Sequence, residues 1–129
     1  MTSLGTMPLV NDYSLCQQMV SIYHHDGGEV TRTVVYPAYL DSKKTEGVDR
    51  TGSSEANGFL LVVPCLGGPA PSVCVGDKVM PGEGPVVDAE DPAKFWRSLI
   101  PTKVPGLCVV RYVDIKHWAG KPVHVEAGG

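Results

Sequence analysis

The four histidines are the first residues here that could do chemistry, because imidazole is a common metal ligand and a proton carrier near neutral pH. His24 and His25 are adjacent in a run that alternates like a β-strand. Adjacent strand residues point to opposite faces, so these two cannot easily hold one ion. His117 and His124 could approach each other across a turn at Gly120. We expect no metal site and histidines that lie at the surface or in an interface.

The cysteines are the next candidates, and they are Cys16, Cys65, Cys74 and Cys108. None belongs to a C-x-x-C pair, which excludes a zinc knuckle or a thioredoxin-like motif. The first ten residues lack a basic segment and an apolar run, so we expect no secretory signal. We therefore interpret the cysteines as reduced thiols of the core or strands. Cys65 and Cys74 could still flank a hairpin and pair if oxidised, and a catalytic thiol lacks a recognised signature.

The acidic residues Asp88, Glu90 and Asp91 precede a helical pattern. Paired carboxylates can act as acid and base when one is buried. At a helix start, however, capping and the helix dipole already favour acidic residues. The glycine-rich stretches contain no phosphate-binding G-K-[ST] ending, and neither G-x-S-x-G nor H-E-x-x-H occurs. We expect no enzyme and no cofactor.

Length and composition limit the remaining classes. The 129 residues correspond to one domain, and 43% hydrophobic residues are enough for a single core. Fifteen glycines and eleven prolines disfavour a helical bundle and favour short strands joined by turns. A formal net charge of -3 disfavours a protein that grips nucleic-acid phosphates. The longest apolar runs are too short to span a bilayer, so we expect no membrane partner.

The elements that must position these residues are mostly strands. Alternation and β-branched residues predict five to seven strands, the terminal one pairing antiparallel with residues 107–118. Pro37 marks an edge strand or a bulge, because proline cannot donate to a ladder. One short helix begins after Asp91, with Pro92 at its first position. The main predicted strands cover residues 19–25, 30–40, 57–64, 77–80, 107–118 and 122–127, and the helical pattern covers 88–99.

These elements predict a mainly β fold, either a small antiparallel β-barrel or a two-layer sandwich with one short helix. Residues 1–18 form an N-terminal arm or a short helix capped by Asp12, and residues 19–129 form a single β domain. Residues 57–64 are nearly all apolar, which indicates a strand buried on both faces. Residues 41–54 form a polar loop. Trp96 is expected in the core, on the apolar face of the helix.

The order of several short motifs resembles that of head–tail connector proteins of tailed phages, of the head-closure or stopper type. A strand ending in an aromatic–proline pair is followed by a polar loop, an apolar strand ending at proline and a Gly-Asp turn-strand. A short helix then precedes a long strand with a basic–aromatic hairpin. The corresponding residues are 34–37, 41–54, 59–64, 76–82, 88–99 and 109–125.

This resemblance implies a structural virion protein, made in the host cytoplasm and located in the phage neck. Such proteins form rings, commonly six-fold, which join the portal and adaptor of the filled capsid to the tail and can gate the DNA channel. DNA would be passing cargo, and an acidic protein would not hold it by its phosphates. A tail-terminator ring, a capsid decoration protein and a cellular β-barrel binding module remain as alternatives.

The resemblance also assigns contact residues. The polar loop is the candidate for the channel or for ring contacts, through Lys43, Lys44, Glu46, Asp49 and Arg50. The N-terminal arm and the C-terminal hairpin are candidates for contacts with neighbouring subunits. Candidate interface side chains are Tyr36, Tyr39, His117, Trp118 and His124.

Overall fold

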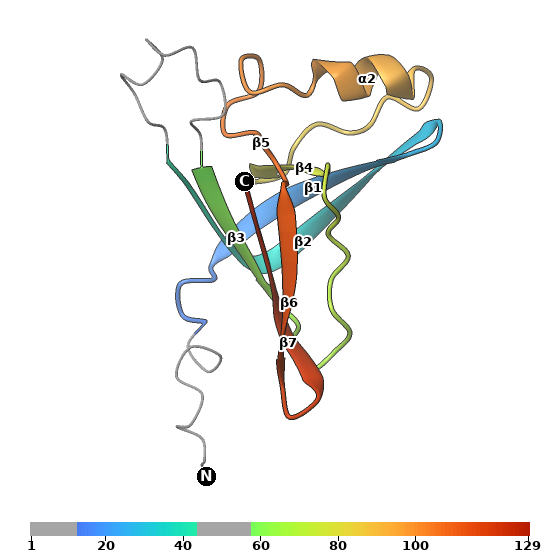
Figure 1. Ribbon diagram of the computed structural model, residues 1–129. Coiled ribbons are helices and arrows are strands. Elements are labelled where there is room, and N and C mark those ends of the chain that lie inside the picture. The colour runs from blue at the N-terminus through green and yellow to red at the C-terminus, as the bar shows by residue number, and fades with distance from the viewer. Residues whose placement is uncertain (1–12, 44–57) are drawn as a thin grey trace.

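In the residues that the structure describes, the protein is a single antiparallel β-sheet that bends over itself and carries one short helix (Figure 1). The computed structural model describes residues 13–43 and 58–129. The sheet order is β5-β4-β1-β2-β3-β7-β6. Within the described ranges, no helix is long and apolar enough to cross a membrane. The elements are β1 (Gln18–Asp26), β2 (Glu29–Lys43), β3 (Gly58–Pro64), β4 (Lys78–Pro81), α2 (Pro92–Ser98), β5 (Cys108–Val109), β6 (Tyr112–Trp118) and β7 (Lys121–Gly128).

The long strand β2 joins the two halves of the sheet, and Pro37 lies where it changes partner. Residues up to Ala38 pair with β1, and the residues from Tyr39 onward pair with β3. The register shifts by one residue here, because Gln18 faces Ala38 whereas Val20 faces Val35. The bulge predicted at Pro37 is therefore confirmed, and the edge-strand alternative is wrong. A proline is tolerated in this central strand because the bulge spares it from donating to the ladder.

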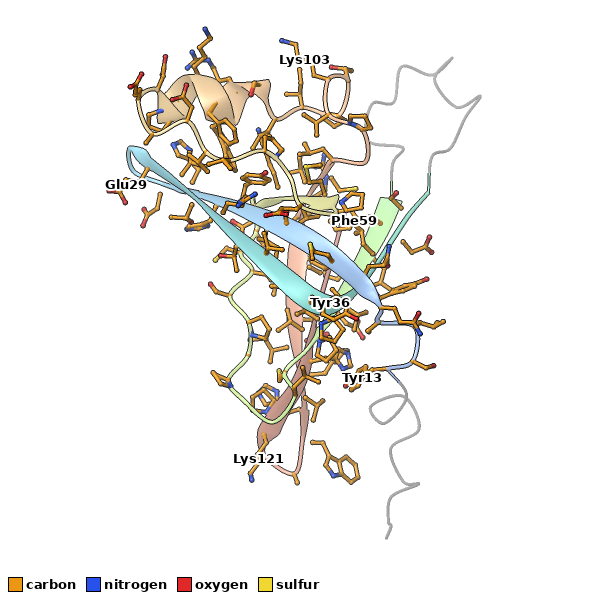
Figure 2. The ribbon with its side chains drawn as sticks, turned by 180° about the vertical axis from the view of Figure 1, so that it is seen from behind. Tyr13, Glu29, Tyr36, Phe59, Lys103 and Lys121 are labelled. Carbon is orange, nitrogen blue, oxygen red and sulfur yellow. The ribbon has the colours of Figure 1, made fainter. Side chains whose placement is uncertain are left out.

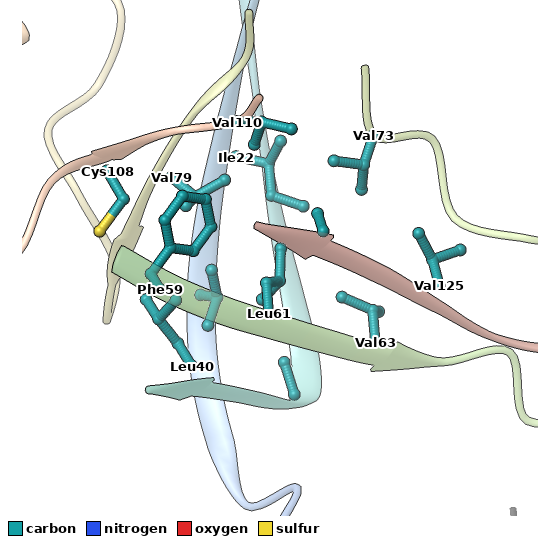
Figure 3. Packing of buried hydrophobic residues seen from close by; sticks show 13 residues of the cluster. Ile22, Leu40, Phe59, Leu61, Val63, Val73, Val79, Cys108, Val110 and Val125 are labelled. Atoms are coloured by element: carbon teal, nitrogen blue, oxygen red, sulfur yellow. The ribbon is translucent and has the colours of Figure 1, made fainter. Parts of the chain in front are cut away.

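The core lies between the two half-sheets, β5-β4-β1-β2 and β2-β3-β7-β6 (Figure 3). The mainly β prediction is correct, and the packing fits a two-layer sandwich; the sheet does not close into a barrel. The buried residues of this first cluster come from both layers, and they are Val20, Ile22, Ala38, Leu40, Phe59, Leu61, Val63, Val73, Val79, Cys108, Val110, Val125 and Ala127.

The predicted strand 107–118 is divided where the chain crosses from one layer to the other. The Val110 N–H donates to the carbonyl of Asp77 beside β4, at 2.8 Å. The next N–H, that of Arg111, donates to Gly128 in β7, at 2.7 Å. These two residues separate β5 from β6, which lie at opposite ends of the sheet order. A strand that changes sheets in this way makes a corner of the sandwich.

A second cluster of buried residues lies on the outer face of the first half-sheet. Figure 1 shows α2 and its flanking loops on this side of the sheet. Tyr23 of β1 is buried there with Leu99 and Leu107, and the ring centroids of Tyr23 and Phe95 are 5.7 Å apart. Trp96 packs against this cluster, as predicted, although it is only half-buried. β1 is therefore buried on both faces.

The prediction that the strand of residues 57–64 is buried on both faces is wrong. In β3, Phe59, Leu61 and Val63 are buried, but Leu60 and Val62 on the opposite face are only half-buried. The physical reason is that α2 and its flanking loops cover β1 rather than β3. An apolar strand sequence shows that both faces can be buried, and the covering layer decides whether they are.

The helix start confirms the capping interpretation of the acidic residues. The Asp91 carboxylate accepts the Lys94 N–H at 3.1 Å, which satisfies one of the free donors of the first turn. The Asp88 carboxylate accepts the Glu90 N–H at 3.0 Å. All three carboxylates are exposed, so none has the burial that an acid–base pair requires.

Two predicted boundaries are corrected by strand pairing. Residues 13–17 form a turn in which the Cys16 N–H bonds to the Tyr13 carbonyl at 2.9 Å, so the short-helix alternative is wrong for this part of the predicted arm. The polar loop does not begin at residue 41, because Asp41 and Lys43 still pair with β3. The remaining predicted loop residues, like residues 1–12, lie outside the described residues.

Candidate functional site

A groove lies on the outer face of the second half-sheet, which the described helix α2 does not cover. Residues that pair across two strands share a face of the sheet. Val62 of β3 pairs with Glu126 of β7, and His124 of β7 pairs with Lys116 of β6, so all four side chains lie on the outer face. The segment before β1 forms the opposite wall. The groove has a volume of about 470 Å³ and is lined by Tyr13, Leu15, Cys16, Tyr39, Leu60, Val62, Lys116, His117, His124 and Glu126.

His117 also lines the groove, and it lies where the register of the C-terminal hairpin shifts. Lys116 faces His124, but His117 faces Pro122, which leaves Val123 as an extra residue in β7. Lys116 and His117 both line the groove, at the point of the hairpin where this irregularity lies.

His124 is the polar centre of the groove and is only 6% exposed. Its Nε2 lies 3.0 Å from the Glu126 carboxylate, and its Nδ1 lies 2.8 Å from the Tyr13 hydroxyl. A carboxylate can only accept, so Nε2 donates to Glu126, and the Tyr13 hydroxyl can donate to Nδ1. Burial, and then the nearby thiols and Glu126, raise the pKa of Tyr13, so its hydroxyl stays protonated and remains a donor.

This arrangement fits recognition better than bond-making. Leu60, Val62 and Leu15 offer apolar surface, and the Tyr13–His124–Glu126 chain fixes one polar position beside it. The thiol that lines the groove is that of Cys16, and burial raises its pKa. A thiol held in its protonated form is a poor nucleophile, so Cys16 is a packing residue.

The structure brings three of the five predicted interface residues together. Tyr39, His117 and His124 line the groove. Tyr36 lies at the bulge of β2 and is 67% exposed, whereas Trp118 ends β6 beside the hairpin turn and is 47% exposed. Figure 2 labels Tyr13 where the described chain begins and Tyr36 where β2 bends.

The predicted channel residues are not brought into this site. Lys43 is the last residue of β2, and its side chain is outside the description. Four more lie entirely outside the described residues, namely Lys44, Glu46, Asp49 and Arg50.

His124 is buried, so the prediction that it lies at the surface is wrong, and the alternative that it lies in an interface stays a prediction. One of the two partners of His124 could have been predicted from the sequence, because Glu126 follows two residues later and must lie on the same face of the strand. The other partner, Tyr13, is 111 residues away, and no periodicity connects the two. Leu60 and Val62 were also missed, because they were assigned to a fully buried strand.

No protein-family model matches the chain, and no curated protein or solved structure matches it.

Proposed function

We propose that this protein is a structural subunit of a phage head–tail connector, a ring that joins the portal and adaptor of the DNA-filled capsid to the tail. The observation that carries the proposal is the meeting of the two regions expected to touch neighbouring subunits. The base of the N-terminal arm lies against the C-terminal hairpin, since the Tyr13 hydroxyl reaches His124 at 2.8 Å. The two regions build one surface, which is what a repeated contact in a ring requires.

The occupant that we propose for the groove is a second copy of this chain. Leu15 is 71% exposed at its rim, and Leu60 and Val62 are half-buried on its floor. Residues 1–12 join the described chain at Tyr13, so every copy carries a further segment attached at this rim. A domain of 129 residues buries a modest fraction of its surface, and association adds apolar burial that stabilises the folded state.

The sheet edges favour a contact through the face of the sheet rather than through strand addition. Strand addition at Pro37 is not available, because β2 is a central strand. One edge strand, β5, has only two residues, and a short edge offers little backbone to a partner. The other edge, β6, carries an ion pair between Lys116 and Asp114 at 2.8 Å. Charges on an edge strand oppose pairing with another chain.

The proposal assigns DNA the role of passing cargo. A net charge of -3 gives a lumen no general attraction for phosphates, which suits a channel through which DNA must slide.

Native mass spectrometry of the full chain, alone and with a purified portal–adaptor assembly, tests the proposal. We expect a closed ring, most simply of six copies, or stoichiometric joining to the assembly. Val62→Lys should abolish ring formation, because it places a charge on the floor of the groove. Val34→Lys, an equally drastic change at an exposed strand position outside the groove, is the matched control. A wild-type chain that stays monomeric and ignores the assembly contradicts the proposal.

The same groove favours one second candidate, a ligand-binding module. Its volume of about 470 Å³ lies within the usual range for small-molecule sites, and such sites combine apolar walls with a few placed polar groups. The same mass spectra separate the two functions. A monomer that carries a constant added mass, lost in Val62→Lys but kept in Val34→Lys, supports the ligand-binding module.

A further inference from the structure

His24, Cys74 and Asp77 form a cluster outside the groove, at the other end of the first half-sheet. The ladder between β1 and β4 ends at the pair Tyr23 and Lys78. The next residues in that register are His24 and Asp77, and the imidazole Nδ1 lies 2.7 Å from the carboxylate Oδ1. One ligand atom from each of the three residues lies within 4.8 Å of the other two. In the described part of the chain, this is the one group of three such residues.

A tight turn holds Cys74 beside Asp77. The Asp77 N–H donates to the Cys74 carbonyl at 3.0 Å, and the Cys74 N–H donates to Oδ2 of Asp77 at 2.9 Å. Gly76 has a φ of +96°, a conformation that L side chains rarely adopt. Two backbone hydrogen bonds with Val110 also stabilise the turn. The Val110 carbonyl accepts from the Gly76 N–H, and the Val110 N–H donates to the Asp77 carbonyl.

The three side chains of this cluster differ in how far they are exposed, whereas both partners of a simple surface ion pair would be exposed. Asp77 is 3% exposed, whereas the His24 side chain is half-exposed and Cys74 is exposed. The other three cysteines are buried, which confirms the core-thiol interpretation for them and corrects it for Cys74. All four are free thiols, so Cys65 does not pair with Cys74. The cluster thus combines a rigid buried carboxylate with two ligands that solvent can reach.

We propose that His24, Cys74 and Asp77 bind a Zn²⁺ ion. Thiolate, imidazole and carboxylate are the three ligand types that zinc takes in proteins, and a thiolate disfavours Mg²⁺ and Ca²⁺. Binding displaces the thiol proton of Cys74 and the proton shared by His24 and Asp77, and these protons pass to solvent. Three protein ligands leave the fourth tetrahedral position to water or to a group from another molecule.

The ion would fasten three parts of the fold at one point. His24 comes from β1, Asp77 precedes β4, and the turn between Cys74 and Asp77 is hydrogen-bonded to the crossover at Val110. Zinc that binds the folded chain and not the unfolded chain stabilises it by mass action. This inference is independent of the groove and of the connector proposal.

The test uses the reduced, full-length chain after treatment with a chelator, with Zn²⁺ alone as the probe. Burial raises the pKa of Cys16, Cys65 and Cys108, so Cys74 is the thiol expected to react with a soluble disulfide reagent in the native protein. We expect one zinc per chain by native mass spectrometry and slowing of Cys74 modification by about tenfold or more. Co²⁺ alone should give a thiolate-to-metal absorption band.

His24→Gln and Cys74→Ser should each weaken zinc binding by about tenfold or more. Both positions are accessible, so these variants should stay folded, which circular dichroism checks. His25→Gln is the matched control, because His25 is the adjacent histidine on the opposite face and stacks on Trp96, with ring centroids 5.1 Å apart. The proposal is overturned if the chain binds no zinc, if His24→Gln and His25→Gln bind it equally, or if Zn²⁺ leaves Cys74 modification unchanged.

Discussion

The two outer faces of the bent sheet differ in what covers them. On the first half-sheet, α2 and its flanking loops bury Tyr23 beside Leu99 and Leu107. On the second half-sheet, the short turn from Tyr13 to Cys16 is the described segment that covers part of the face, and an apolar groove remains beside it. Both faces carry apolar side chains at alternate strand positions. The difference therefore comes from the covering layer and not from the strands.

The same alternation of apolar residues thus supports a face covered by a helix and a face that carries an open groove. The helix layer is fastened by several interactions, among them Lys78, whose Nζ donates to the Trp96 carbonyl at 2.9 Å and lies 4.2 Å from the Trp96 ring centre. Burial lowers the pKa of Lys78, because the charged ammonium is partly removed from water. The groove face is fastened by Tyr13 through its contact with His124. A face left open in this way is available to a partner.

The largest effect should come from truncating the covered face. Leu99→Ala removes a side chain that is 1% exposed in the second cluster, and we expect the free energy of unfolding to fall by about 2–5 kcal/mol. Val62→Ala on the groove face should cost less than about 1.5 kcal/mol, because Val62 is only half-buried. Urea unfolding of dilute protein measures both. Equal losses would show that the two faces are covered alike.

Next in size should be the loss of the polar contact that fastens the groove wall. Tyr13→Phe removes the donor to Nδ1 of the buried His124, and we expect a loss of about 1–3 kcal/mol. The same loss of a hydroxyl at the exposed Tyr36, in Tyr36→Phe, should change stability by less than about 0.5 kcal/mol. Thermal unfolding of both variants would reveal whether Tyr13 belongs to the folded unit; no difference between them would place it outside.

The smallest effect should come from the start of the helix. Asp91→Ala removes the cap on the Lys94 N–H and should cost about 1 kcal/mol, because α2 has only seven residues and its end contributes strongly. Glu90→Ala, an exposed neighbour outside the cap, is the control. Hydrogen exchange should show faster exchange in α2 for Asp91→Ala and unchanged exchange in β7. Acceleration in both would mean that the two faces open together.

Local patterns in the sequence determined much of the scaffold. Alternation and turn residues predicted most of the strands, the pairing of β6 with β7 and the bulge at Pro37, because each depends on neighbours within a few residues. The Asp91–Pro92 pair predicted the start of α2 for the same reason. The interface candidates Tyr39, His117 and His124 came from the resemblance in motif order, which did not predict that they would share one groove.

Only the tertiary structure decided which faces were covered. Alternation predicts that a strand has two faces, but burial of the second face depends on layers contributed from elsewhere in the chain. The helix therefore buried β1 where the sequence favoured β3. The strand break at Val110, the contact of Tyr13 with His124, and the meeting of His24 with Cys74 and Asp77 likewise join residues far apart in the chain. Such contacts depend on how the half-sheets pack, and no short-range pattern encodes them.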